Sequence, residues 1–476
     1  MSVRSKSNRE VEAPAEPERD GSELPEGWVT VRLKELAKVE WGNTSITKKS
    51  YVANGHTAFS ASGPDGFLPT FEWQGEAVVL SAIGARCGKC FFAEGEWTAI
   101  KNTIVIQGNP SLIDHRLLFH YLNDEHKWEI SGSGQPFITM GTANETLIPL
   151  PPLAEQRRIA GKLELLLGKV SSSQQRLSRV PGLLKRFRQS VLAAACSGKL
   201  TADWCEENEA DPIDSLTEID IPAEFPTLPD SWSWTTLESV CVKVVDCPHS
   251  TPKWTDAGKL CIRTTNFRPG ILDLSEVRFV SSATFNERIE RLRPEPGDIV
   301  YSREGGILGI ACLVPPGVEL CLGQRMMLFR VGSEYSTTLL MHWLNSPVIT
   351  HRVQELTGGS ASPHLNVRDI RAFPTPAPPL SEQQEIVRRV EKLFTFADQI
   401  ESRLKKAQAH VDRLTQSLLT KAFRGELVPT EAELARSDNR SYEPASELLV
   451  RIQTEREQSG EPSKVTTKRA RAATRK

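Results

Sequence analysis

One hexapeptide occurs twice in this chain, and that repeat constrains the fold more than any other feature. Residues 151–156 read Pro-Pro-Leu-Ala-Glu-Gln, and residues 378–383, which lie 227 positions later, read Pro-Pro-Leu-Ser-Glu-Gln. The similarity continues at the same offset as far as Ser-Gly-Lys-Leu at 197–200 and Arg-Gly-Glu-Leu at 424–427. Because a long internal repeat indicates two copies of one structural element, we expect the same element twice.

A second, shorter repeat marks where the globular part before each helix begins. Residues 24–28 read Leu-Pro-Glu-Gly-Trp, and residues 228–232 read Leu-Pro-Asp-Ser-Trp, an offset of 204. The two offsets differ by 23, so the second globular part is longer than the first. The chain is therefore predicted to alternate a globular domain, a helix, a larger globular domain and a second helix.

Both long repeats carry the apolar spacing of a coiled-coil helix. Apolar residues recur in alternating steps of four and three over about 33 residues in each copy, and only Ser173 interrupts the row. A narrow seam of this kind needs a partner helix, and the other copy is the nearest candidate. The predicted seam residues are Ile159, Leu163, Leu166, Leu177 and Leu184 in the first copy, and Ile386, Val390, Leu393, Ile400, Leu404, Val411 and Leu414 in the second.

Local residues predict where these helices start and stop. Ser381 follows a proline-rich run and is predicted to be an N-cap. Gly198 and Gly425 stand where a C-terminal stop is expected. Pro181 lies inside the first seam, where a proline should kink the helix or split it in two.

The globular parts show strand patterns instead. Short apolar runs alternate with turn residues over 75–107 and again over 260–331, as in a mostly β domain. A helix is expected near the end of each domain, around 117–128 and 338–353. We therefore divide the chain into a disordered tail 1–22, a globular domain 23–150, a helical spacer 151–205, a linker 206–227, a second globular domain 228–376, a distal helical spacer 377–429 and a basic tail 430–476 without fixed structure.

Composition fits a soluble protein of two or three domains. Apolar residues make up 39% of the chain and charged residues 25%, and no apolar run approaches the ~18 residues of a membrane span. The polar N-terminus has no secretion signal, so we expect a cytoplasmic protein. The nine cysteines are predicted to be reduced thiols, and the lone Cys87/Cys90 pair is more consistent with a turn than with zinc.

These residues resemble a known family. Two Pro-Pro-Leu-x-Glu-Gln runs, each opening a long helix and each preceded by a Leu-Pro-x-x-Trp domain, look like the specificity subunits of type I restriction–modification systems. The resemblance covers about residues 24–430. It implies an α+β fold in which two mostly-β target-recognition domains are separated by two long helices. Those helices would pair as an antiparallel coiled coil, giving the chain pseudo-two-fold symmetry.

The resemblance also implies partners. Each domain would read one half of a split double-stranded DNA target, and the helices would dock two modification (methyltransferase) subunits and the restriction subunits. This chain would bind no cofactor or metal itself. S-adenosylmethionine, ATP and magnesium would belong to the partner subunits, and no membrane would be involved. The net charge of −2 argues weakly against DNA, although it does not exclude a local basic face.

Base reading needs donors and acceptors on loops, with arginine suited to guanine and asparagine or glutamine to adenine. For any single residue the alternative is a solvated loop position or a turn former. The candidates are Ser60, Ser62, Arg86, Lys89, Lys101, Asn102, Gln135 and Thr139 in the first domain, and Arg263, Thr265, Asn266, Arg303, Glu304, Gln324, Arg325, His364 and Asn366 in the second.

Catalytic signatures are missing from the sequence. It contains no GxxxxGK[ST], no GxGxxG, no HExxH and no Asn/Asp-Pro-Pro-aromatic run. Asp298 with Glu304 only faintly suggests a nuclease carboxylate pair, so we predict a non-catalytic chain. Two alternatives stay open: a coiled-coil scaffold that binds no DNA, and a divergent metal-dependent nuclease.

Overall fold

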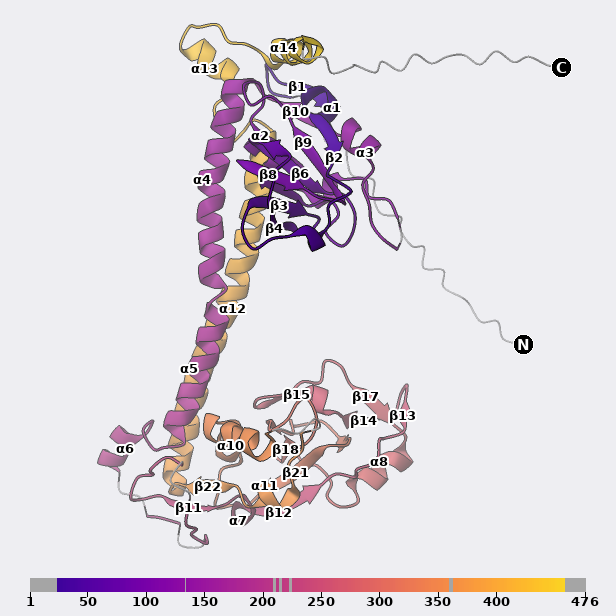
Figure 1. Cartoon of the computed structure of the whole chain (residues 1–476). Helices are drawn as coiled ribbons and strands as arrows, with labels where there is room; N and C mark the ends of the chain where they lie inside the picture. Colours follow the sequence, from indigo (N-terminus) through magenta and orange to yellow (C-terminus); the bar gives the residue numbers. More distant parts are fainter. Residues whose placement is uncertain are drawn as a thin grey trace, which may run out of the picture. The chain divides into compact units, whose positions relative to one another are not determined.

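The computed structural model describes residues 24–132, 134–208, 211–213, 216–221, 225–358 and 363–458. The predicted tail 1–22 and the basic end of the chain lie outside these residues. The described chain forms two compact units (Figure 1), and each is described by itself. The first unit combines residues up to 175 with those from 408 onward, and the second comprises residues 176–407.

The first unit holds a globular domain built on two four-stranded sheets. One sheet has the order β2–β9–β6–β7, all antiparallel, and the other has the order β4–β3–β8–β5, in which β3 and β8 run parallel. The short pair β1–β10 closes the domain where the chain enters and leaves it. The strands are β1 (Val29–Arg32), β2 (Lys38–Trp41), β3 (His56–Ser60), β4 (Gly63–Leu68), β5 (Trp73–Gln74), β6 (Ala77–Ser81), β7 (Cys90–Ala93), β8 (Glu96–Ala99), β9 (Thr103–Gln107) and β10 (Leu147–Leu150).

The second unit repeats this topology in its larger domain. The order β12–β21–β18–β19 matches the first sheet, and β14 pairs with β20 in parallel as β3 does with β8. The pair β11–β22 corresponds to β1–β10. The strands are β11 (Ser233–Thr236), β12 (Cys241–Asp246), β13 (Trp254–Thr255), β14 (Lys259–Ile262), β15 (Phe267–Arg268), β16 (Ile271–Leu272), β17 (Arg278–Val280), β18 (Ile299–Ser302), β19 (Ala311–Leu313), β20 (Leu320–Leu322), β21 (Met326–Val331) and β22 (Pro374–Ala377).

The central strands are apolar on both faces because each sheet is covered on both sides. In β6, Val78 and Leu80 point into one core, and Ala77 and Val79 point into the other. In β18, Ile299 and Tyr301 join a core that includes helical residues, whereas Val300 joins the core beneath the second sheet. Successive side chains of a strand point to opposite faces, so a continuous apolar run is what such a strand requires.

Short helices complete both domains, and most begin at a capping side chain. Asp114, Thr139, Ser281, Ser336 and Ser346 accept hydrogen bonds from backbone N–H groups at helix starts. The helix expected over 338–353 is in fact two, because Pro347 begins a new helix. These helices are α1 (Leu33–Leu36), α2 (His115–Leu122), α3 (Met140–Glu145), α6 (Ala202–Glu207), α7 (Leu237–Val240), α8 (Ser282–Ile289), α9 (Thr337–Leu344), α10 (Pro347–Thr357) and α11 (Val367–Arg371), with single 3₁₀ turns at Lys48–Ser50, Glu125–Lys127 and Thr264–Asn266.

The repeated segments form long helices, as predicted. The second copy is one helix, α12 (Leu380–Phe423), and the first is split into α4 (Leu153–Leu177) and α5 (Val180–Ala195), with Pro181 in the first turn of α5. The predicted N-cap Ser381 lies inside the first turn of α12 instead. The carbonyl of Pro379 accepts from the Gln383 N–H, so the helix begins earlier than the sequence suggested.

The helices pair antiparallel inside each unit. In the first unit, Ile159 and Leu163 of α4 share a core with Ala422 of α12, and Gln174 donates to Asp412 at 3.2 Å. In the second, Val191 of α5 and Val390 of α12 belong to one core, and Arg188 lies 2.6 Å from Asp398. The numbering rises on one helix as it falls on the other, which is the antiparallel arrangement.

Burial along the predicted seam is uneven. Ile159, Leu163, Leu184, Ile386, Val390 and Leu404 are buried, whereas Leu166, Leu177, Leu393, Ile400 and Val411 are half-buried. Leu414 is 40% exposed. A two-helix pair covers only one side of each helix, so residues at the edge of the seam keep contact with solvent.

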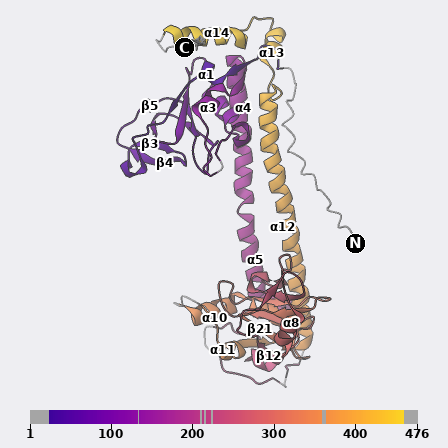
Figure 2. The ribbon, with the colours of Figure 1, turned by 90° about the vertical axis from the view of Figure 1, so that its right-hand side faces the viewer.

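The prediction that the chain has no fixed structure beyond residue 430 is wrong for residues 431–458. These residues form α13 (Glu431–Ser437) and α14 (Ala445–Gln458), and Figure 2 shows α14 beside α1 at one end of the first unit. Ala445, Leu448 and Ile452 are buried in the core of the first domain. Charged residues surround these apolar positions in the sequence, so their helical spacing gives only a weak signal.

Candidate nucleic-acid interface

In the first domain, backbone hydrogen bonds gather the predicted loops into one surface. The N–H of Ala82 donates to Asn102 O at 3.0 Å, and the carbonyl of Ala82 accepts from Ile138 N at 2.8 Å. Gly84 N donates to Pro136 O at 3.0 Å. These contacts bring together the turn at 100–102, the loop 82–89 and the segment 134–139. We call this the first loop surface.

All eight candidates of the first domain belong to this surface or border it. Arg86 is exposed and donates to the carbonyl of Ser62 at 2.8 Å, which joins the loop at 60–63 to the rest. Thr139 caps α3. Asn102 has a φ of +71°, a backbone conformation that asparagine tolerates better than most residues. The side chains of Ser62, Lys89, Lys101 and Gln135 are exposed.

Ser60 is the exception, because its side chain is buried and already paired. Its hydroxyl donates to Asp65 at 2.6 Å. Burial opposes ionisation of Asp65, but hydrogen bonds from Lys48, Ser60 and Tyr51 outweigh it and hold the pKa of Asp65 below its ordinary value. The carboxylate is therefore a firm acceptor, and Ser60 supports its loop from within.

The second domain uses the same backbone frame with different side chains. Arg303 N donates to Arg325 O at 3.0 Å, and the carbonyl of Arg303 accepts from Leu365 N at 2.8 Å. Gly305 N donates to Pro363 O at 3.1 Å. Arg303 thus occupies the place that Ala82 has in the first domain, and Arg325 that of Asn102. Arg325 also shares the positive φ, +71°. The gathered segments form the second loop surface.

The candidates of the second domain divide into exposed and internal side chains. Thr265, Arg325, His364 and Asn366 are exposed, whereas Arg263, Glu304 and Gln324 are half-buried. Asn266 is 3% exposed and holds a turn by accepting from Arg263 N and donating to the carbonyls of Asp273 and Glu276. Arg303 is 6% exposed and is also bonded internally.

Sequence reasoning missed one loop on each surface, the loop that follows β2 or β12. Gly42 N donates to Thr103 O at 2.9 Å, and Cys247 N donates to Met326 O at 3.1 Å, so both loops join the frame at equivalent strands. Thr251 donates to Gln324 at 3.0 Å, and the side chain of His249 is 67% exposed. The polar residues His249, Ser250 and Thr251, shortly after the end of β12, were the available signal.

The chemistry of both surfaces suits a polyanion. Exposed basic residues stand beside amides and hydroxyls, and these are the groups that bind phosphate and base edges. The basic side chains are Arg86, Lys89 and Lys101 on the first surface, and Arg325, with His249 and His364, on the second.

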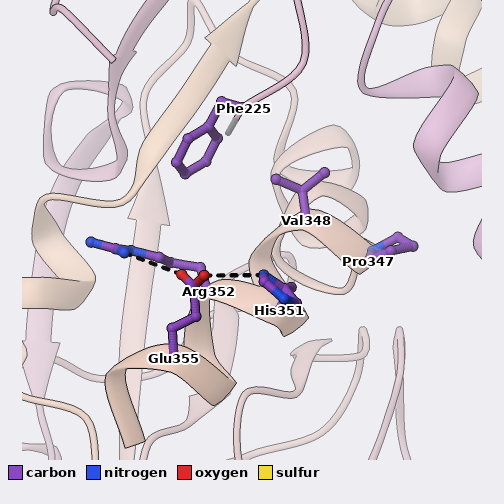
Figure 3. A pocket seen from close by; sticks show the side chains of 6 residues that line it. All are labelled: Phe225, Pro347, Val348, His351, Arg352 and Glu355. Carbon is purple, nitrogen blue, oxygen red and sulfur yellow. Dashed lines mark hydrogen bonds and ion pairs between the residues drawn. The ribbon is translucent and has the colours of Figure 1, made fainter. Parts of the chain in front are cut away.

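One hollow of the second unit is lined differently from the loop surfaces. Figure 3 shows a cavity of about 310 Å³ beside α10, where Glu355 pairs with His351 and Arg352. The other lining residues, Phe225, Pro347 and Val348, are apolar. Across the described residues, no group of three histidine, cysteine, aspartate or glutamate side chains could hold a metal. No helix in that part of the chain has the length and apolar character of a membrane span.

The chain thus has two sheet domains with matched loop surfaces, and each domain packs with long helices. This is the architecture of a DNA-specificity subunit. The family model described as "Type I restriction modification DNA specificity domain" matches residues 25–181 and 264–408. The chain is 30% identical to the type I restriction enzyme EcoDI specificity subunit of Escherichia coli over 464 residues, covering 92% of this chain and 97% of that subunit. It is 32% identical to the EcoKI subunit of strain K12 over 66% of this chain and 64% of that one. The chain belongs to the family of type I restriction enzyme specificity subunits.

Solved structures agree on the fold. A chain reported under the description "complex assembly and conformational transition of the type I R-M system" aligns with a TM-score of 0.62 at 20% identity, covering 85% of this chain and all of that one. The HsdS subunit of Thermoanaerobacter tengcongensis aligns with a TM-score of 0.50 at 21% identity, covering 86% of this chain and 99% of that one. The predicted α+β fold with sheet domains and long helices is confirmed.

Proposed function

We propose that this chain is the sequence-specific DNA-binding subunit of a type I restriction–modification complex and that each globular domain reads one half of a bipartite target. Its role is recognition and assembly, while catalysis belongs to methyltransferase and restriction subunits. Membership of the specificity-subunit family supports this assignment.

One observation carries the assignment of one half-site to each domain. Both domains hold their loops with equivalent backbone hydrogen bonds, at Ala82 in the first and at Arg303 in the second. The side chains mounted on that frame differ, because Asn102 is replaced by Arg325 and Thr139 by Asn366. A common frame with different donors and acceptors is what two readers of unlike sequences need.

The internal repeat of the helices supports two equivalent docking places for one kind of partner. We propose that two modification subunits bind there and that restriction subunits join them. S-adenosylmethionine, ATP and magnesium would be bound by those partners. Phosphate contacts from the basic loop residues would make DNA binding weaken steeply as salt rises.

The test is methylome sequencing of the host strain with and without the gene for this chain. One bipartite adenine-methylated motif should disappear with the gene. Purified chain incubated with duplex DNA and Mg²⁺ should leave the DNA intact. Cleavage by the chain alone, or a methylome that does not change, would overturn the proposal.

A domain exchange then assigns the half-sites. Replacing residues 24–150 with the matching domain of a relative should change one half of the motif only. Because Leu448 and Ile452 of α14 lie in the core of this domain, the exchange must carry residues 443–458 as well. An exchange of residues 24–150 alone serves as the control and should yield a less stable protein. A change in both halves would show that the domains do not read separately.

A further inference from the structure

Arg303 is a buried arginine whose side chain is bonded inside the second domain. Its Nε and Nη2 donate to the two carboxylate oxygens of Asp246 at 2.9 and 3.2 Å, and its Nη1 donates to the carbonyl of Leu365 at 3.0 Å. With only 6% of the residue exposed, this guanidinium has little surface left to offer a base pair. Any influence on recognition must pass through the groups that it holds.

Asp246 and His249, which contact this guanidinium, belong to the loop 246–252 that follows β12 on the second loop surface. Asp246 ends β12, and its Oδ2 lies 3.0 Å from Nε2 of His249, three residues into the loop. The other ring nitrogen of His249 lies 3.4 Å from Nη2 of Arg303. Further along the loop, Thr251 reaches Gln324. The Arg303 side chain therefore ties the loop 246–252 to the segment at 363–366, and the bond between Thr251 and Gln324 ties the same loop to the turn at 324–325.

The first domain has no counterpart of this ion pair at the equivalent position, which is occupied by Ala82. Ala82 makes the same two backbone hydrogen bonds as Arg303 but has only a methyl group to offer. The equivalent loop there is held by backbone pairing, with Asn43 N donating to Ala99 O at 2.8 Å, and by a different side chain, since Nδ2 of Asn43 donates to the carboxylate of Glu72. The two surfaces are thus fixed by different means.

We propose that the Arg303–Asp246 pair is a positioning device for the second loop surface alone and that accurate reading of the second half-site depends on it. Reading base edges requires side chains held to within about 0.5 Å of the productive geometry. A bidentate arginine–carboxylate pair out of water fixes both distance and angle. The groups placed this way are those of loop 246–252, beside Arg325 and His364. This inference rests on the proposed function, because it names which internal contact keeps that function accurate.

The same domain supplies a matched control. Arg330 donates to Asp298 through Nε at 3.0 Å and Nη2 at 2.8 Å, and Asp298 is 5% exposed. Asp298 immediately precedes β18 and Arg303 immediately follows it, so the two pairs stand at opposite ends of one strand. At ~3.3 Å per residue, the control pair lies more than 10 Å along the strand from the loop surface.

The experiment compares methylation rates given by the full-length chain in complex with its modification subunits. Duplexes carry the motif found by methylome sequencing, or that motif with one base pair changed in either half. For Arg303→Ala, discrimination in the half read by the second domain should fall about tenfold or more, since one wrong base pair ordinarily costs that much. Discrimination in the other half should stay within about twofold. Arg330→Ala should lower the unfolding temperature but leave both halves within about twofold.

The outcomes separate this inference from the function on which it rests. If the wild-type complex showed no bipartite motif, the proposed function itself would fail. If it showed one, but Arg303→Ala stayed accurate, or Arg330→Ala lost accuracy to the same extent, the positioning role would be refuted. If Arg303→Ala did not fold, Asp246→Asn provides the test, because asparagine keeps the shape of the Asp246 side chain and removes its negative charge. Undiminished accuracy in Asp246→Asn would refute the proposal.

Discussion

Trp232 donates its indole N–H to the buried carboxylate of Glu382 at 2.7 Å, across 150 residues of sequence. Trp28 makes the same contact with Glu155 at 3.0 Å in the other unit. Each partner belongs to one of the two repeated motifs, the Leu-Pro-x-x-Trp start or the Pro-Pro-Leu-x-Glu-Gln helix entry. The repeated motifs therefore meet in space, which gives a physical reason for the recurrence of both.

Replacing Glu382 with alanine should destabilise the second unit by about 2–4 kcal/mol, because the buried Trp232 N–H and Thr201 hydroxyl would lose their shared acceptor. Urea unfolding followed by tryptophan fluorescence measures this. Glu355→Ala is the control, since that glutamate pairs with His351 and Arg352, its side chain is 42% exposed, and its loss should cost less than about 1 kcal/mol. Equal losses in the two variants would contradict the prediction.

The glycines after the long helices should be intolerant of any side chain. Gly425 has a φ of +75°, and a Cβ there would lie 2.4 Å from Cγ of Pro25. Gly425→Ala should cost about 1–2 kcal/mol for the backbone and about 1–3 more for the clash. Gly95 has a φ of +76° and open space around it, so Gly95→Ala measures the backbone cost without a clash. Thermal unfolding of the two alanine variants should differ clearly, and similar unfolding temperatures would show that Pro25 moves aside.

His342 should make the second unit sensitive to acid. Burial lowers the pKa of His342 from its ordinary 6.5 to about 4, and its ring packs edge-on against Phe394. The unfolded state therefore binds a proton at His342 at a higher pH than the folded state does. The free energy of unfolding should be largest above pH 6.5 and should fall by roughly 3 kcal/mol in all as the pH drops toward 4.

The measurement is the unfolding free energy of wild type and His342→Leu at several pH values between 7 and 4. The variant should lose less stability over this range than the wild type. His351→Ala is the control, because that side chain is 72% exposed, and its pH profile should follow the wild type. Parallel profiles for all three proteins would refute the role of His342.

Helix α14 should stabilise the first domain through one face only. Leu448 is fully buried and Val450 is 62% exposed, two residues apart on the same helix. Leu448→Ala should cost about 2–5 kcal/mol, and Val450→Ala less than about 0.5 kcal/mol. Differential scanning calorimetry distinguishes them. If Leu448→Ala were harmless, α14 would contribute nothing to the stability of the domain.

The repeat made the architecture predictable from sequence, because it is carried by apolar spacing and by proline and glycine, whose effects are local. The split at Pro181 and the stops at Gly198 and Gly425 were predictable for the same reason. The loop residues were predictable as groups, since polar residues between apolar strands must lie at strand ends.

The inward direction of Arg303 and Asn266 was not predictable. An arginine after a strand is ordinarily a surface residue, and what buries Arg303 is a carboxylate 57 positions earlier in the chain. Such a pairing depends on which strands become neighbours, and apolar spacing does not determine that. The helical face of α14 was hidden for a related reason, because the domain that it covers ends at residue 150 and the helix begins only at residue 445.

The main-chain hydrogen bonds that organise both loop surfaces have a consequence for how such a protein can change. Except at proline, which has no N–H, a peptide N–H or carbonyl can make its hydrogen bond whatever side chain its residue carries, as alanine at 82 and arginine at 303 illustrate. Substitutions at outward-facing loop positions can therefore accumulate without disturbing the scaffold. New target sequences would then be reached by drift in a few side chains, while the strands beneath keep their pairing.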